Sequence, residues 1–366
     1  MFQANAFTKG DQRWPEIAVS YDGRSIVTTW SSDKQHRDGW SVVGRRFDWS
    51  GKPAGGEFAL DDFRGGTFPN AEDPKTDFDA AGNFVIAWHV QGTDGDERKW
   101  TIFERRYHAD GTPFGPGKRV PTDTIFDHWR PTVMVAGNGD AMVTWYAERD
   151  AANGDKVSDI KGRMLNARDE FAGDEIQISG TAEMRRLQWR QGAVSRKGHF
   201  APFWYAEKPS MTGFVRLFDR NGVARSPELT FPDFVNAGAR ANGDVLVSFG
   251  GKGQWITASG QPSGQPLQVR IGEIAMNDDG AFVVISVNEG PQGHGLYAYP
   301  YDHEGHDLSQ PILLSKGHKN LGGPPHVDMS QNGVIVATWE EGGGTDGDGA
   351  SVWGAITLHP SYRRRP

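Results

Sequence analysis

The chain has 366 residues, no cysteine and a formal net charge of −8. The lack of cysteine excludes disulfides and thiolate chemistry, and an acidic chain does not offer the basic surface that general nucleic-acid binding requires. Forty-eight glycines, spaced between short apolar runs, are typical of an all-β protein with many turns.

The N-terminal segment and the hydropathy bear on where the protein acts. No run approaches the roughly 18 consecutive apolar residues of a membrane-spanning helix, so we expect no membrane span. Residues 1–12 lack the basic start and apolar stretch of a signal peptide. Two interpretations stay open: a cytoplasmic protein, or a secreted one whose signal was removed and whose Met1 was restored.

The first part of the chain contains four short strand-like runs. They span residues 16–20, 25–30, 40–47 and 57–60. Asp22-Gly23 separates the first two runs, and Asp-Gly between apolar runs is a strong hairpin signal because both turn positions tolerate positive φ. We predict one four-stranded antiparallel sheet here.

The same unit recurs along the chain. Its second strand ends at corresponding residues that are 57 to 59 positions apart in the first four copies: Trp30, Trp88, Trp145, Trp204, Phe249, Val287 and Trp339. Its third strand carries an arginine in four copies: Arg45, Arg105, Arg163 and Arg216. Because both sets follow the repeat, we interpret them as packing and blade-to-blade contacts.

Seven units of about 52 residues predict an all-β fold, a seven-bladed β-propeller of four-stranded antiparallel blades. We expect a single domain, residues 1–366. The predicted blades span about 11–66, 67–124, 125–180, 181–231, 232–269, 270–318, and 319–366 together with 1–10.

The ends of the chain predict how the ring closes. The seventh unit supplies three strands, at residues 326–330, 334–339 and 352–358, whereas an extra run at residues 2–8 precedes the first unit. Counting from Trp339 to the last residue and on to Trp30 gives 57 residues, the spacing of the long repeats. We therefore expect residues 2–8 to complete the seventh blade, which removes an exposed sheet edge.

The first three units share a pattern with a known class of repeats. Residues 10–30 read GDQRWPEIAVSYDGRSIVTTW, and GRRFD with GKPAGGEFAL follows. Residues 9–180 thus resemble the repeats of large bacterial surface and haemolysin-type calcium-binding proteins, and the match fades after Leu187. The resemblance implies a bacterial, extracellular or periplasmic, propeller-like module without agreed catalytic residues. In architecture the chain is also similar to seven-bladed propeller lectins and polysaccharide lyases.

The long loops predict the working face. Loops between the second and third strands, and between units, emerge together around the central opening of a propeller, and long loops on a rigid scaffold commonly carry binding sites. The candidate ligand-binding residues at these positions are Trp14, His89, His128, Trp129, Arg130, Tyr146, Glu148, Arg186, Trp189, Arg190, Tyr205, Glu207, His326 and Glu340. Flat aromatic faces with hydrogen-bonding groups suit a sugar, and arginine adds pairing to a carboxylate or sulfate. Blade packing for the tryptophans and solvation for the glutamates remain the alternatives.

These residues support three hypotheses for function. The first is a secreted, lectin-like protein, expected to be a monomer, that binds a carbohydrate, with an anionic glycan favoured by the arginines. The second is a polysaccharide lyase, which needs a group that neutralises the uronate, a base and an acid. The candidates for these roles are His128, Tyr146, Tyr205, Arg130 and Arg190. The third is a protein-interaction scaffold.

Two acidic loops raise the question of a cation. Asp94 and Asp96 lie in one glycine-rich loop, and Asp346 and Asp348 lie in another. Closely spaced carboxylates with glycines between them can hold Ca²⁺ through oxygen ligands. Ordinary turns are the alternative interpretation, and no other cofactor is expected.

Overall fold

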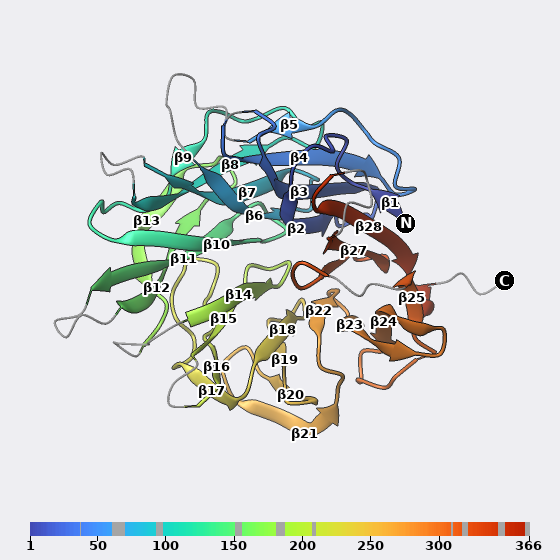
Figure 1. The fold of residues 1–366 in the computed structure, drawn as a ribbon. Coiled ribbons are helices and arrows are strands. Elements are labelled where there is room, and N and C mark those ends of the chain that lie inside the picture. The colour runs from blue at the N-terminus through green and yellow to red at the C-terminus, as the bar shows by residue number, and fades with distance from the viewer. Residues whose placement is uncertain are drawn as a thin grey trace.

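The computed structural model describes residues 1–36, 38–60, 70–92, 98–150, 156–180, 187–206, 210–308, 310–316, 321–342 and 348–362, with the backbone alone for 187–191 and 289. In these residues the strands form seven four-stranded antiparallel sheets arranged in a ring (Figure 1). This confirms the predicted seven-bladed propeller. No helix in the described ranges is long and apolar enough to cross a membrane.

Each blade runs from an inner first strand to an outer fourth strand. Blade 1 contains β2 (Gln12–Val19), β3 (Ser25–Asp33), β4 (Trp40–Asp48) and β5 (Phe58–Ala59). Blade 2 contains β6 (Ala71–Phe78), β7 (Phe84–Gln91), β8 (Trp100–Tyr107) and β9 (Lys118–Arg119). Blade 3 contains β10 (Asp127–Val135), β11 (Ala141–Asp150), β12 (Lys156–Leu165) and β13 (Phe171–Gln177).

The remaining blades repeat this order. Blade 4 contains β14 (Leu187–Val194), β15 (Phe200–Ala206), β16 (Thr212–Val215) and β17 (Leu229–Pro232). Blade 5 contains β18 (Val235–Ala239), β19 (Val245–Phe249), β20 (Lys252–Ile256) and β21 (Pro262–Gln268). Blade 6 contains β22 (Glu273–Met276), β23 (Phe282–Gly290), β24 (Gly293–Tyr301) and β25 (Ile312–Lys316). Blade 7 contains β26 (His326–Met329), β27 (Val334–Glu341), β28 (Ser351–Leu358) and β1 (Phe2–Gln3), and a single 3-10 turn, η1 (Pro360–Tyr362), follows.

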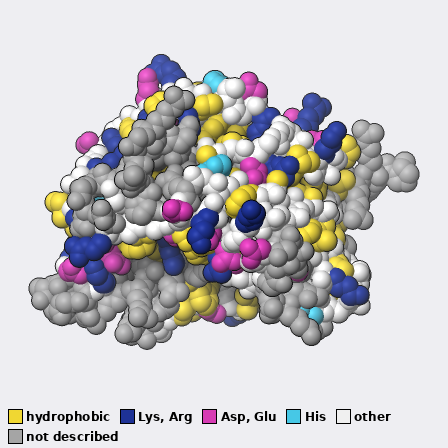
Figure 2. Space-filling model, turned by 45° about the horizontal axis from the view of Figure 1, so that its top comes forward, with side chains coloured by type: hydrophobic (Ala, Val, Ile, Leu, Met, Phe, Trp, Pro, Cys, Tyr) yellow, Lys and Arg dark blue, Asp and Glu magenta, His cyan; other side chains and the backbone are white. Residues whose placement is uncertain are grey.

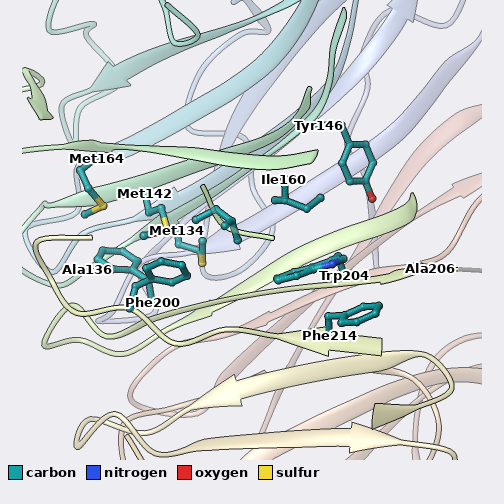
Figure 3. Packing of buried hydrophobic residues seen from close by; sticks show 12 residues of the cluster. Met134, Ala136, Met142, Tyr146, Ile160, Met164, Phe200, Trp204, Ala206 and Phe214 are labelled. Carbon is teal, nitrogen blue, oxygen red and sulfur yellow. The ribbon is translucent and has the colours of Figure 1, made fainter. Parts of the chain in front are cut away.

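The recurring tryptophans pack between the blades, as predicted from their spacing. The five are almost fully buried: Trp30, Trp88, Trp145, Trp204 and Trp339. Between blades 3 and 4, Trp204 stacks on Phe214, with ring centroids 5.7 Å apart. Figure 3 shows this cluster, in which the methionines of blade 3 lie beside Phe200 of blade 4. The hydrophobic core is therefore divided among the interfaces between neighbouring blades.

The recurring arginines also link neighbouring blades. Arg163 of blade 3 donates to the carbonyl of Val120, which follows the last strand of blade 2, at 3.0 Å. Arg216 of blade 4 donates in the same way to the carbonyl of Ile178 at 2.9 Å. Arg45 reaches the carbonyl of Ala4 at 3.1 Å. The structural interpretation of these three arginines is thus confirmed. Arg105 donates to the carbonyl of Gly115 in its own blade at 2.8 Å.

The N-terminal residues complete the seventh blade, as predicted. Strand β1 pairs with β28, with Phe2 opposite Gly354. The ring of Phe2 also packs against Phe47 of blade 1, 4.6 Å between centroids, so that this residue joins the two ends of the ring. The strand is shorter than the predicted residues 2–8, because the Asn5 side chain accepts the next ladder bond, from the Val352 amide at 3.0 Å.

Candidate functional site at the mouth of the central channel

The first strands of blades 1 to 3 each contain a β-bulge at the same place. The pairing register shifts between Arg13 and Glu16, and equivalent shifts occur in β6 and β10. In each bulge a residue with positive φ precedes a proline: Trp14 (φ 52°), Asp73 (φ 51°) and Arg130 (φ 47°). Proline is tolerated there because a bulged residue makes no ladder bond. Non-glycine residues rarely adopt positive φ, so three strained residues lie at one end of the ring.

A side chain from the preceding blade accepts a hydrogen bond from each strained amide. The acceptors follow the packing tryptophan of the second strand. The Trp14 amide donates to Glu340 Oε2 at 3.3 Å. The Asp73 amide donates to Ser31 Oγ at 3.0 Å, and the Arg130 amide donates to His89 Nδ1 at 3.2 Å. Glu340 and His89 are buried, so these contacts hold the bulges in place and direct the bulged side chains.

The channel between the first strands begins with a ring of polar residues. The residue three positions before the end of the first strand is polar in all seven blades, and the side chains of six of these residues are described: Glu16, Lys75, Thr132, Asn236, Glu273 and His326. Beyond this ring a cavity of about 170 Å³ is lined by residues from the first strands of every blade. The polar ring is therefore the mouth of the central channel.

Charged members of the ring pair from blade to blade. His326 Nδ1 lies 3.2 Å from Glu273 and 3.6 Å from Glu16. Lys75 Nζ lies 3.2 Å from Glu16 and 3.0 Å from Asp73. Carboxylates thus alternate with His326 and Lys75 over blades 6, 7, 1 and 2, and this pairing offsets part of the cost of burying charged groups.

The pairing shifts the pKa values of the ring. Burial raises the pKa of a carboxyl group, but the charge of Lys75, its hydrogen bond and the charge of Arg130 outweigh this effect and lower the pKa of Asp73 to about 2. Burial disfavours the charged form of His326, yet Glu16 and Glu273 outweigh it and raise the pKa of this histidine. Both shifts favour the charged forms of Asp73 and His326.

Beside the mouth lies a pocket that we call the tryptophan pocket. Its volume is about 240 Å³. It is lined by Trp14, Glu72, Asp73, Lys75, His89, Trp129, Arg130, Pro131 and His326. All three strained residues line it, so the bulges direct their side chains to one place. On the face shown in Figure 2, acidic, basic and hydrophobic side chains are likewise intermixed.

The two tryptophans of this pocket belong to separate aromatic pairs. Trp14 packs on Trp40 with ring centroids 5.3 Å apart, and Trp129 packs on Trp100 at the same distance. The edge of His89 meets Trp100, 4.6 Å between centroids. Each indole ring thus packs against a second tryptophan.

His89 and Arg130 provide polar groups in the wall of the pocket. Because His89 Nδ1 accepts the Arg130 amide, the ring carries its proton on Nε2. This Nε2 is buried, has no hydrogen-bond partner among the described residues and lies 4.0 Å from Glu72. The Arg130 side chain is exposed, and within the described ranges its guanidinium forms no ion pair or hydrogen bond. Both groups can therefore donate to a ligand.

A second pocket, the apolar pocket, meets the first at His326. Its volume is about 400 Å³. It is lined by Phe203, Tyr205, Phe234, Val235, Asn236, Ile271, Gly272, Glu273, Ile285, Ser286, Val287, Pro324, Pro325 and His326. Tyr205 and Phe234 pack edge to face, 4.5 Å between centroids. The channel mouth therefore joins a polar, tryptophan-containing pocket over blades 1 to 3 to an apolar one over blades 4 to 7.

Two buried carboxyl groups lie one step deeper in the channel. Asp328 of blade 7 accepts the amides of Val19 in blade 1 at 2.8 Å and of Met329 at 2.7 Å. In the same way, Asp77 of blade 2 accepts the amides of Val135 in blade 3 and of Phe78. Burial raises the pKa of Asp328 to about 6 and that of Asp77 well above its usual range. Asp77 and Asp328 also repel each other.

We expect Asp328→Asn to remove part of the pH dependence of stability. Between pH about 4 and 6 the folded protein keeps a proton on Asp328 that the unfolded chain has released. The free energy of unfolding of the wild type therefore falls as pH rises through this window, by about 3 kcal/mol at most. Urea unfolding at pH 4, 5, 6 and 7 measures the unfolding free energy of wild type and Asp328→Asn. The test is the difference between the two proteins, because Asp77 and His326 contribute to the pH dependence of both. Parallel pH profiles would contradict the expectation.

The structure brings together five of the residues selected from the sequence and places others elsewhere. Trp14, His89, Trp129, Arg130 and His326 line the tryptophan pocket, and Tyr205 lines the apolar one. Glu340 accepts a hydrogen bond from the Trp14 amide at 3.3 Å. Arg186, Glu207, Asp94, Asp96 and Asp346 lie outside the described residues, and so do the side chains of Trp189 and Arg190.

The remaining selected residues have other surroundings. His128 is 0% exposed inside blade 3, where Nε2 lies 3.4 Å from Asp123, and burial lowers its pKa. Tyr146 belongs to the core between blades 3 and 4 (Figure 3). Glu148 lies 3.7 Å from Lys156, and burial raises its pKa. Asp348 is exposed and accepts the Gly10 amide at 3.2 Å.

Sequence reasoning missed residues that the bulges bring to the site. Glu72, Asp73 and Lys75 line the tryptophan pocket, and Glu16 and Glu273 hold its His326. A signal was available, because proline interrupts the first strand at the same place in three units. The two pocket tryptophans lie differently relative to the bulges: Trp14 lies within its bulge, whereas Trp129 directly precedes one.

Comparisons with known proteins identify the architecture. No protein-family model matches the chain, and no curated protein sequence matches it. A crystal structure of a protein of unknown function from Dyadobacter fermentans is 11% identical, with 97% of each chain covered and a TM-score of 0.57. The polysaccharide lyase Uly1 is 11% identical over 96% of this chain and 90% of its own, with a TM-score of 0.56.

A third similar structure is the α-L-arabinanase of Penicillium chrysogenum. It is 12% identical over 98% of each chain, with a TM-score of 0.50. At these identities the likeness establishes the propeller fold alone. The resemblance to haemolysin-type repeats stays a prediction.

Proposed function

We propose that this protein is a carbohydrate-binding propeller that holds an acidic sugar in the tryptophan pocket. The observation that carries the proposal is the combination of two indole rings, each packed on a second tryptophan, with two donors that form no hydrogen bond within the described residues, His89 Nε2 and the Arg130 guanidinium. Indole faces pack against the C–H faces of a sugar, and side-chain donors bind its hydroxyl groups.

Arg130 is the reason to propose an acidic sugar. A guanidinium can donate two parallel hydrogen bonds to a carboxylate or sulfate. Its neighbour Asp73 is already paired with Lys75 at 3.0 Å, which leaves the guanidinium available to a ligand. The strained backbone at Arg130, with its amide bound by His89, fixes where this charge is presented.

The similar structures are compatible with a glycan ligand. One of them is a polysaccharide lyase, and another is an arabinanase complexed with arabinobiose. Both carry the same propeller fold, so a ring of this shape can present loops to a saccharide. Secretion from a bacterium and a monomeric state, expected from the sequence, remain part of this proposal.

A screen of acidic and neutral oligosaccharides tests the proposal. We expect the wild type to bind at least one class of uronate-containing or sulfated oligosaccharide. Absorbance of the unsaturated product, followed in the same samples, distinguishes binding from lyase activity. Binding without turnover supports a carbohydrate-binding protein. A screen without a saccharide ligand would overturn the proposal.

The arrangement favours binding over the lyase that the sequence also suggested. Of the candidates for acid and base, His128 is buried in blade 3 and Tyr146 lies in the core. Both nitrogens of His89 are committed, since Nδ1 accepts the Arg130 amide and Nε2 carries the proton. His89 can therefore donate a hydrogen bond to a sugar but cannot act as a base in this position.

We expect Arg130→Gln to weaken binding of acidic sugars selectively. Loss of a charge-assisted pair lowers the affinity for a uronate by about tenfold, whereas the affinity for the corresponding neutral sugar stays nearly unchanged. Isothermal titration calorimetry with both sugars gives the comparison. Arg168→Gln is the matched control, because this exposed arginine pairs with Glu170 in a hairpin of blade 3. Equal loss for both sugars would contradict the role assigned to Arg130.

A further inference from the structure

The apolar pocket has the size and lining of a site for an aromatic ring. An engineered apolar cavity of about 150 Å³ binds benzene, and this pocket measures about 400 Å³. Phe234 is 47% exposed and presents its ring beside Tyr205. Ile271, at 69% exposure, and the adjacent Pro324 and Pro325 extend the apolar wall. Aromatic side chains favour edge-to-face contacts with a bound ring.

The position of the pocket connects it to the proposed sugar site. His326 lines both pockets, and Glu273, which pairs with His326 at 3.2 Å, lines the apolar one. A ligand that fills both pockets passes over the His326 side chain. Such a ligand is polar at one end and apolar at the other.

We propose that the natural ligand is a sugar that carries an aromatic substituent, an aryl glycoside or aromatic ester, with its ring in the apolar pocket. This inference rests on the proposed sugar site for the polar half of the ligand. The apolar pocket contributes affinity for the ring, and the tryptophan pocket contributes selectivity for the sugar. The two contributions are separable because, apart from the shared His326, they involve different side chains.

A small aromatic fragment tests the apolar pocket without reference to the sugar. We expect 4-fluorobenzyl alcohol to bind the wild type weakly, as measured by ¹⁹F NMR. Phe234→Ala should weaken this binding by about tenfold and Ile271→Ala by about threefold. Ile125→Ala is the matched control, because Ile125 is 73% exposed and lies outside the pocket. Trp14→Ala should leave fragment binding unchanged.

A pair of glycosides tests the connection between the pockets. The methyl and phenyl glycosides of the sugar found by screening are titrated by calorimetry. We expect the phenyl glycoside to bind about tenfold more tightly, and this gain should disappear in Phe234→Ala. Failure of the fragment to bind, or an equal affinity of the two glycosides, would overturn the inference. A fragment that binds to a protein for which no sugar is found would overturn the proposed function instead.

Discussion

Replacement of Lys75 by methionine is expected to destabilise the propeller by about 3 to 5 kcal/mol. Lys75 Nζ neutralises both Glu16 and Asp73, at 3.2 and 3.0 Å, and all three side chains are largely buried. Without the ammonium group, Asp73 loses its ion pair with Lys75 and Glu16 keeps only His326, at 3.6 Å, so two buried carboxylates of neighbouring blades are poorly compensated. Urea unfolding at pH 7 measures the loss.

An exposed lysine supplies the control for this change. Lys156 forms two ion pairs, with Asp150 at 2.9 Å and Glu148 at 3.7 Å, but its side chain is 56% exposed. Lys156→Met should cost less than about 1 kcal/mol, because solvent screens such pairs. Adding Glu16→Gln to Lys75→Met should restore part of the stability. Equal losses for Lys75→Met and Lys156→Met would contradict the stabilising role of the charged ring.

Trp204→Ala is expected to cost about 3 to 5 kcal/mol of unfolding free energy. The indole is almost fully buried between blades 3 and 4, stacked on Phe214 within the cluster of Figure 3. Its removal leaves a cavity that rigid neighbouring strands cannot fill. Chemical unfolding followed by circular dichroism measures the change.

Trp49 is the matched control for this tryptophan. It is 65% exposed in a turn of blade 1. Trp49→Ala should change stability by no more than about 0.5 kcal/mol. If Trp204→Ala lowered the unfolding free energy no more than Trp49→Ala, the packing between blades would not be a main source of stability.

The ring of blades could be predicted from the sequence because its signals are local and repeated. Gly-containing turns mark the hairpins, and a tryptophan at a fixed place in five units marks the interface between blades. Closure by residues at the N-terminus followed from one spacing. The length of the closing strand could not be predicted, because the Asn5 side chain replaces a backbone hydrogen bond there and this depends on tertiary geometry.

The composition of the site was only partly predictable. Exposed residues at strand ends, such as Trp14 and Arg130, can be selected from their place in the repeat. The burial of His128 and Tyr146 could not be inferred in this way, because strand parity alone does not show which side chains the neighbouring blade covers. Lys75 was missed because its role arises from carboxylates that are distant in sequence and meet only at the channel mouth.

The bulges explain why this end of the ring is suited to a ligand. Positive φ at a residue other than glycine costs of order 1 to 3 kcal/mol, and three such residues line one pocket. Each is held by an acceptor from the preceding blade, so the packing of the blades compensates the strain. The same contacts fix the side chains of the pocket before a ligand arrives, which reduces the entropy lost on binding.

Calorimetric titration of the best oligosaccharide into wild type, Trp14→Ala and Trp49→Ala tests the sugar site most directly. Trp14 is 38% exposed in the tryptophan pocket, and Trp49 is exposed away from it. We predict that Trp14→Ala weakens binding by about tenfold or more, with unchanged circular dichroism, whereas Trp49→Ala binds like the wild type. Wild-type affinity in Trp14→Ala, or an equal loss in Trp49→Ala, would contradict a sugar site at the channel mouth.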